Sequence, residues 1–129
     1  MKSVHDLENL RAGSLEVRTQ EETVLAEGRP LRLSVREYRL LVALARRRDR
    51  VVSRAELFTT VWGRALREGD RSVDVYVRRL RVKLRIALPE WSYIHTHFGF
   101  GYRFSPEREA GDDGVTGLSH LVHKDALAS

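Results

Sequence analysis

Residues Asp70–Leu88 read DRSVDVYVRRLRVKLRIAL. Apolar side chains recur along it at positions i, i+4, i+7 and i+11, namely at Val73, Val77, Leu80 and Leu84. That spacing places them on one side of an α-helix, where they can be buried together. The pattern therefore predicts one amphipathic helix, which Pro89 brings to an end.

The opposite side of this helix mixes short polar, apolar and long basic side chains: Arg71, Ser72, Val75, Tyr76, Arg78, Arg79 and Val82. Between Arg71 and Arg85 the chain carries six basic residues and one acid, Asp74. Such a helix suits the major groove of DNA, which is wide enough to admit it and presents guanine edges to arginine. A solvated helix with an ordinary basic face is the alternative interpretation of the same pattern.

The composition limits the classes of protein to which the chain can belong. Its 129 residues suffice for one domain with tails. The net charge of +5 and the pI near 10.1 favour polyanionic partners. Residues 29–108 hold 19 lysines and arginines against 8 acids, whereas the rest of the chain is net acidic. The basic surplus therefore lies entirely in the middle of the chain.

Cysteine is absent from the sequence, which excludes disulfides and thiolate metal sites. No apolar run approaches the length needed to span a membrane, and the first residues lack a hydrophobic signal segment. We therefore expect a soluble intracellular protein.

Short strands are predicted before the helical part of the chain. Residues 1–13 are polar and show no clear period, and we interpret them as a loose lead-in. Three short runs follow at residues 14–18, 23–26 and 29–33, separated by turn-like sequences. Together they predict a small antiparallel meander.

Two capping-box sequences predict the starts of two further helices. In each, a serine and a glutamate three residues later can satisfy free backbone N–H groups at the start of the helix. Ser34 and Glu37 begin a helix that we expect to run to residue 48, and Ser53 and Glu56 begin a shorter helix that ends near residue 61.

Two aromatic, β-prone runs follow the basic helix at residues 93–98 and 102–104, and they flank Gly99-Phe100-Gly101. This arrangement predicts a β-hairpin with glycines at the bend. Three helices followed by a hairpin make a winged helix-turn-helix, an α+β fold whose third helix enters the DNA groove. We expect residues 105–129 to form a disordered tail, in which Leu118, Leu121 and Val122 could make a short helix.

These motifs resemble the effector domain of the OmpR/PhoB family of bacterial response regulators. The resemblance covers about residues 14–104, in the family's order and spacing. Its motifs are GxLxV from Gly13, GRPLRLSxxEYxLL from Gly28, VVSRAEL from Val51, VWG from Val61, RSVDVYVRRLRxKL from Arg71 and GFGYRF from Gly99.

The resemblance implies a four-stranded N-terminal sheet, three helices and a C-terminal hairpin wing within residues 14–104. It implies a transcription regulator of the bacterial cytoplasm, located on the nucleoid, that binds promoter DNA as two head-to-tail copies on direct-repeat half-sites. It also implies that the loop at residues 62–70 contacts RNA polymerase. The chain has no long heptad pattern and no cysteine, so we expect a monomer in solution. Neither a cofactor nor an enzymatic activity is expected.

Candidate DNA contacts follow from the positions that match the family's motifs. Arg79, with the surface of Ser72 and Val75, is our candidate for reading bases. Phosphate contacts are expected from Tyr76, Arg78 and Arg81 on the same helix, and from Arg54 and Trp62 nearby. Arg71, at a position that touches bases or phosphates in relatives, and Lys83 are further expected DNA contacts. Phosphate contacts fix the register of a protein on DNA but do not choose the sequence. The expected wing contacts are Thr96, Phe98 and Tyr102.

The sequence departs from the family pattern in two places. Residues 1–13 cannot hold the phosphoaccepting receiver domain that precedes this domain in a full response regulator. His97 and Phe98 stand where many members have an apolar residue followed by arginine. The second departure puts insertion of an arginine into the minor groove in doubt.

Other residues of the sequence suggest alternatives to DNA binding. His95 and His97 fall on one face of a predicted strand, but no third ligand lies nearby, so no metal site is predicted. His120 and His123 have ligand-like spacing within the expected tail. Asp74 is expected to be an ion-pair partner that orients an arginine, and Trp62 fits either the core or a DNA contact. The alternative function is a winged helix used mainly for contacts with RNA polymerase or a partner regulator.

Overall fold

A computed structural model describes residues 9–109 of the chain. The elements, in chain order, are β1 (Asn9–Ala12), β2 (Leu15–Arg18), β3 (Thr23–Ala26), β4 (Arg29–Pro30), α1 (Val35–Ala45), β5 (Val51–Val52), α2 (Arg54–Trp62), α3 (Ser72–Ala87), β6 (Trp91–His97) and β7 (Gly101–Arg108). This is the predicted α+β winged helix-turn-helix, with three helices between an N-terminal sheet and a C-terminal hairpin.

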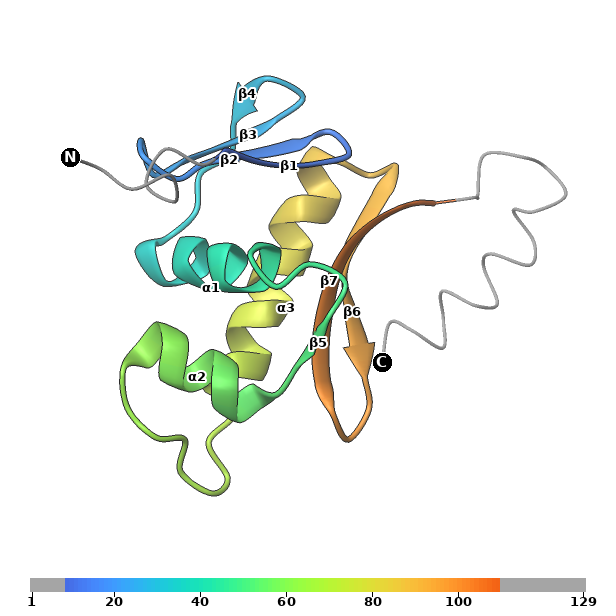
Figure 1. Cartoon of the computed structure of the whole chain (residues 1–129). Helices are drawn as coiled ribbons and strands as arrows, with labels where there is room; N and C mark the ends of the chain where they lie inside the picture. The colour runs from blue at the N-terminus through green and yellow to red at the C-terminus, as the bar shows by residue number, and fades with distance from the viewer. Residues whose placement is uncertain (1–8, 110–129) are drawn as a thin grey trace, which may run out of the picture.

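Two antiparallel sheets enclose the helices. The N-terminal sheet has the strand order β1-β2-β3-β4, and the second sheet has the order β5-β7-β6. The N-terminal sheet covers one end of α1 and α3, whereas the hairpin of β6 and β7, here called the wing, runs along α3 (Figure 1). The turn of the wing points to the same end of the molecule as the first residue of α3 (Figure 1).

The starts of α1 and α2 follow the predicted serine caps, with one difference. Ser34 and Glu37 form the full reciprocal capping box at the start of α1. At the start of α2, the hydroxyl of Ser53 accepts the backbone N–H of Glu56, but the carboxylate of Glu56 instead binds Arg47 and Arg50. The second capping box is therefore half formed, because two nearby arginines compete for its carboxylate.

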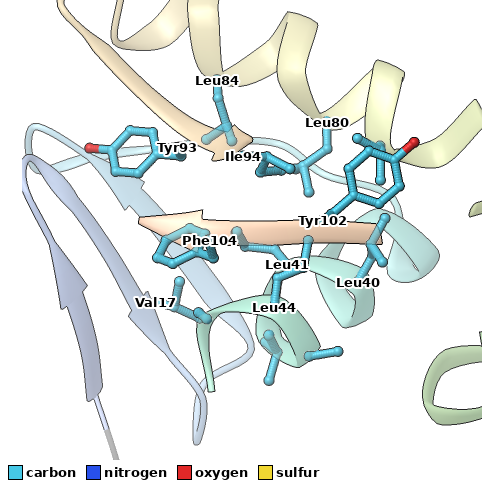
Figure 2. Packing of buried hydrophobic residues seen from close by; sticks show 14 of the residues in the cluster. Val17, Leu40, Leu41, Leu44, Leu80, Leu84, Tyr93, Ile94, Tyr102 and Phe104 are labelled. Atoms are coloured by element: carbon cyan, nitrogen blue, oxygen red, sulfur yellow. The ribbon is translucent and has the colours of Figure 1, made fainter. Parts of the chain in front are cut away.

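The core is built on the apolar side of α3, as the spacing predicts. Val73, Val77, Leu80 and Leu84 are all buried. Figure 2 shows Leu80 and Leu84 packed with side chains from α1 and the wing, among them Leu41, Ile94 and Phe104. The opposite side of α3 is consequently left at the surface.

Several element boundaries differ from the sequence-based expectation. α1 ends at Ala45 rather than at residue 48, and the run expected at residues 29–33 is a strand only at Arg29–Pro30. Residues 9–12 of the expected lead-in form β1, which pairs with β2 over four residues. The expected start of the tail at residue 105 is wrong, because β7 continues to Arg108, which pairs with Trp91 of β6. Val51–Val52 forms an unexpected strand, β5, beside β7. These polar or very short strands are set by pairing with another strand rather than by their own pattern.

Residues 110–129 lie outside the described residues, and so do Leu118, Leu121, Val122, His120 and His123. Within residues 9–109, none of the helices combines the length and the apolar character that crossing a bilayer requires.

Candidate nucleic-acid interface

The surface side of α3 carries a line of exposed aliphatic side chains. Val75, Val82 and Ile86 follow one another at i, i+7 and i+11, and they are 42%, 47% and 78% exposed. At 3.6 residues per turn, this spacing places them along one line of the helix. We call these three residues the apolar crest of α3. Three exposed aliphatic side chains along one line form an apolar patch, which is more informative than a single exposed residue.

Exposed arginines lie on both sides of the apolar crest. Helical geometry places Arg71, Arg78 and Arg85 on one side of it and Arg79 on the other. Arg78 makes no hydrogen bond, ion pair or ring contact with residues 9–109, whereas the guanidinium of Arg79 lies 4.9 Å from the ring centre of Tyr76. The crest and its arginines therefore form one continuous surface, apolar along the middle and cationic at the edges.

Arg79 contacts a series of packed aromatic rings, Phe58, Trp62 and Tyr76. Trp62 stacks on Phe58 at 4.7 Å between ring centres, and Tyr76 meets the edge of Trp62 at 5.6 Å. Arg79 then lies over Tyr76, and the guanidinium of Arg36 lies 4.7 Å from the ring centre of Trp62, the middle ring of the three. Cation–π contacts of this kind restrict the rotamers of arginine. Trp62 is thus half-buried against the core and packs on α3 through Tyr76.

Asp74 joins the recognition side of α3 to α2 and to the wing. Its carboxylate accepts hydrogen bonds from Nε of Arg54 at 2.7 Å and from the hydroxyl of Tyr102. Arg71 lies 3.6 Å away. Burial alone would raise the pKa of Asp74, but the hydrogen bonds from Tyr102 and Arg54 outweigh it and lower the pKa below its ordinary value. The prediction that Asp74 is an ion-pair partner that orients an arginine is confirmed.

Replacing Asp74 with alanine is expected to destabilise the protein by about 2–3 kcal/mol at neutral pH, because Arg54 and Tyr102 lose their common acceptor in a partly buried site. A carboxyl with a lowered folded pKa contributes stability above its unfolded pKa of about 4, and that contribution is lost as pH falls through the folded value. Urea unfolding between neutral and acidic pH measures both effects.

The Asp74→Asn variant is the matched control, since its amide oxygen can still accept from Tyr102 while the charge is gone. It should lose less stability than Asp74→Ala and should lose the pH dependence attributed to this site. An unchanged difference between wild type and Asp74→Ala at acidic pH would contradict the assignment.

Arg81 braces the wing against α3 instead of projecting outward. Its guanidinium donates to the backbone oxygen of Ile94 at 3.0 and 2.8 Å and to the hydroxyl of Thr96 at 2.6 Å. It also lies 5.5 Å from the ring centre of Tyr102. Burial lowers the pKa of Arg81 below its ordinary value. Arg81, Thr96 and Tyr102 were predicted DNA contacts, and the structure engages all three in holding the wing.

Lys83 lies on the side of α3 that faces α1. Its ammonium binds the carboxylate of Glu37 at 2.7 Å and the backbone oxygen of Arg32 at 3.2 Å. We therefore leave Lys83 out of the proposed interface. The fold brings together Ser72, Val75, Tyr76, Arg78 and Arg79 on α3, with Arg71 and Arg54 at its start.

Several surface residues were missed by sequence reasoning. Ile86 and Arg85 extend the exposed side of α3 by a turn, and their spacing from Val75 and Arg78 was the available signal. Phe100 was interpreted only as part of a bend, yet it is 75% exposed beside Phe98, which is 69% exposed. The spacing of apolar residues in helices and strands does not predict which side chains are exposed at a hairpin turn.

The wing histidines are engaged within the protein. Nε2 of His95 lies 2.8 Å from the backbone oxygen of Ser105, and Nε2 of His97 accepts from Nε of Arg103 at 3.0 Å. Within the part of the chain that the structure describes, no three His, Cys, Asp or Glu residues gather as a potential metal site.

The chain is similar to known bacterial transcription regulators. A family model described as "Transcriptional regulatory protein, C terminal" matches residues 28–104. The transcriptional regulatory protein CreB of Escherichia coli is 38% identical over 93 residues, which make up 72% of this chain and 41% of CreB. The chain thus spans about two fifths of the length of that relative.

Solved structures share the fold. The DNA-binding domain of Klebsiella pneumoniae RstA, determined in complex with the RstA box, matches with a TM-score of 0.70 and 31% identity, over 78% of this chain and 99% of that one. The response regulator DrrB of Thermotoga maritima, an OmpR/PhoB homologue, matches with a TM-score of 0.62 and 29% identity, over 75% of this chain and 44% of DrrB.

Proposed function

Because the chain belongs to the OmpR/PhoB family of transcription regulators, we propose that it binds double-stranded promoter DNA sequence-specifically through its winged helix. The observation that carries this proposal is the surface side of α3, where exposed arginines border the apolar crest. α3 would lie in the major groove, and the wing would lie beside it against the backbone and minor groove. The basic surplus of residues 29–108 supports the same partner.

Base reading is proposed for Arg79 and the apolar crest. Arg79 is held over Tyr76, so less side-chain freedom is lost when it donates two hydrogen bonds to a guanine edge. The exposed methyl groups of Val75 suit the C5-methyl group of thymine, which only the major groove presents. Arg78 and Arg71 lack such support and suit phosphate contacts. The preferred site would therefore combine a guanine with a neighbouring thymine.

Salt-dependent binding to duplex DNA tests the proposal. Each neutralised phosphate releases counterions, so the logarithm of the binding constant should fall linearly with the logarithm of the salt concentration. The alternative function, a winged helix used mainly for protein contacts, predicts weak binding without sequence preference. Selection of bound sites from random duplexes reports the preferred sequence, the spacing of half-sites and their orientation in one experiment.

Arg79→Ala and Arg78→Ala are expected to separate base reading from phosphate binding. Arg79→Ala should weaken binding to the selected site by about 1–3 kcal/mol and relax the preference at one base pair. Arg78→Ala should weaken binding to all sequences alike and lower the salt slope by about one. Competition with random duplex measures both. Equal losses on selected and random DNA for Arg79→Ala would overturn its role in base reading.

The partners named by the family resemblance are part of the same proposal. Two copies would bind direct-repeat half-sites head to tail, starting from a monomer in solution. The loop between α2 and α3, within residues 62–70, would contact RNA polymerase, and most of its residues are exposed. Such a protein would act in the bacterial cytoplasm, on the nucleoid.

A further inference from the structure

Two phenylalanines stand exposed at the turn of the wing. Phe98 is 69% and Phe100 is 75% exposed, and neither ring packs on another aromatic ring among residues 9–109. The sequence between them is a single glycine, and Gly101 follows. The turn is closed by a hydrogen bond of 2.8 Å from the backbone N–H of Phe100 to the backbone oxygen of His97. Two neighbouring exposed rings at a closed turn form a compact apolar tip.

The wing tip is fixed in place from one side by the start of α2. A Cβ atom on Gly101 would lie 2.0 Å from the backbone oxygen of Val52, so the backbone of the wing touches the backbone of β5 without space between them. β5 leads directly into α2 through Ser53. This contact fixes the position of the wing backbone at Gly101, directly beside the tip.

The wing is also braced to α3 at two points. The hydroxyl of Tyr102 donates to Asp74, and the guanidinium of Arg81 donates to Ile94 and Thr96. Tyr102 pairs with Thr96 across the wing, so the two braces hold both strands at the same level. The distance from the tip to the exposed side of α3 is thereby set by the fold.

We propose that Phe98 and Phe100 form an aromatic wedge that inserts between neighbouring base pairs in the minor groove beside the site read by α3. This inference rests on the proposed function and adds a second mode of sequence selection to it. Apolar wedges in the minor groove partly unstack a base step and bend the duplex toward the major groove. The base faces exposed by unstacking can accept aromatic rings whatever the sequence.

The charges around the tip favour DNA over an apolar protein surface. Arg103 contacts His97 directly beside the tip, and Arg54 and Arg71 lie at the start of the helices that face the same end of the molecule. Cationic side chains around a small apolar tip suit a polyanion with an apolar interior, which a base stack provides. An apolar protein surface would gain nothing from the cationic side chains around the tip, among which that of Arg71 is largely exposed.

The wedge would read the deformability of DNA rather than base edges. Pyrimidine–purine steps such as TA and CA unstack most easily, so inserting the wedge at such a step requires the least deformation energy. Because the tip is braced to α3, the preferred step should lie at a fixed offset from the bases read by Arg79 and Val75. A flexible wing would give no fixed offset.

Fluorescence of 2-aminopurine tests the wedge on the full 129-residue chain. The probes are duplexes selected by the wild-type protein, with 2-aminopurine at successive steps of the flank, because its fluorescence rises when it is unstacked. We expect a several-fold rise at one step with wild-type protein and no rise with the Phe98→Ala/Phe100→Ala variant. Site selection with this variant should lose the pyrimidine–purine step while keeping the bases read by α3.

Val35→Ala is the matched control, because Val35 is an aliphatic residue that is 66% exposed at the start of α1, away from the wing. It should leave the fluorescence rise intact, and thermal melts should show that all variants are folded. Sequence-specific binding without a rise at any flank step would overturn the wedge while leaving the proposed function in place. Absence of any salt-dependent binding would overturn both. A protein dimer without DNA that is lost on removing both rings, with no rise, would assign the tip to a second copy instead.

Discussion

Replacing Gly101 with alanine is expected to be the most damaging single substitution in the wing. The Cβ atom would lie 2.0 Å from the oxygen and 2.7 Å from the carbon of the Val52 carbonyl group, and both are backbone atoms that cannot rotate away. The φ angle of +143° also belongs to a region that side chains disfavour. Strain and overpacking together should reduce the free energy of unfolding by about 3–5 kcal/mol, measured by urea unfolding.

Gly99→Ala provides the matched control for this prediction. Gly99 also has a positive φ, of +83°, but nothing lies within 4 Å of the added Cβ atom. Alanine at this position should therefore lower the free energy of unfolding only through the strain of a positive φ, by roughly 1–2 kcal/mol. The difference between the two variants isolates the contact of β7 with β5. Equal losses in both variants would contradict a close backbone contact at Gly101.

Loss of that contact should also impair DNA binding. A displaced β7 would move Tyr102 away from Asp74 and weaken one of the two braces between the wing and α3. In the fraction of Gly101→Ala protein that remains folded, the fixed offset of the wing from α3 should be lost, whereas Gly99→Ala should retain it.

The helices could be predicted from the sequence because their signals are local. Ser34 and Ser53 mark helix starts through bonds that reach only three residues, and the period of Val73, Val77 and Leu80 belongs to one helix. Physical rules of capping and amphipathicity therefore suffice for these elements. The order of three helices followed by a hairpin then indicates a winged helix-turn-helix.

The unexpected strand β5 and the unexpected end of β7 depend on pairing with another strand. Val51–Val52 is too short to carry a period, and it becomes a strand only because β7 passes beside it. The last residues of β7 are polar and include Pro106, so composition suggested a tail, yet β6 pairs with them as far as Arg108. Non-local pairing of this kind cannot be derived from the residues of either strand alone.

The sequence predicted which side of α3 each candidate residue occupies, but it did not predict which partners the long side chains contact. A helical period tells which side of α3 a residue occupies, and it correctly placed Val75, Arg78 and Arg79 at the surface. Arg81 and Lys83 have long side chains that turn toward neighbouring elements and find partners there. Which basic residues bind DNA therefore depends on acceptors contributed by the wing and α1, and the sequence of the helix does not contain them.

The buried carboxylate of Glu37 accepts a hydrogen bond from Lys83 and holds its ammonium against α1. Its side chain is 5% exposed, and its carboxylate accepts from Nζ of Lys83 at 2.7 Å and from the backbone N–H of Ser34 at 2.8 Å. Burial alone would raise the pKa of Glu37, but the bonds from Lys83 and Ser34 outweigh it and lower the pKa below its ordinary value. The carboxylate is therefore charged at neutral pH, and it depends on Lys83 for its counter-charge.

Lys83→Met keeps the aliphatic stem and removes the ammonium, so it should leave a buried carboxylate without its ion-pair partner. We expect a loss of about 2–4 kcal/mol at neutral pH, at the lower end of the range for broken buried pairs because Lys83 is itself partly exposed. The ion pair contributes stability above the unfolded pKa of Glu37, about 4.3, and the contribution is lost as pH falls through the folded value. The difference between wild type and variant should therefore shrink in acid.

A double-mutant cycle and a DNA titration complete this test. In a Glu37→Gln background, Lys83→Met should cost much less, since no buried charge is left unpaired. The folded Lys83→Met protein should bind DNA with the salt slope of wild type, whereas Arg78→Ala should lower that slope by about one. A slope lowered by Lys83→Met as much as by Arg78→Ala would return Lys83 to the DNA interface. It would also mean that the contact with Glu37 is exchanged for a phosphate when the protein binds.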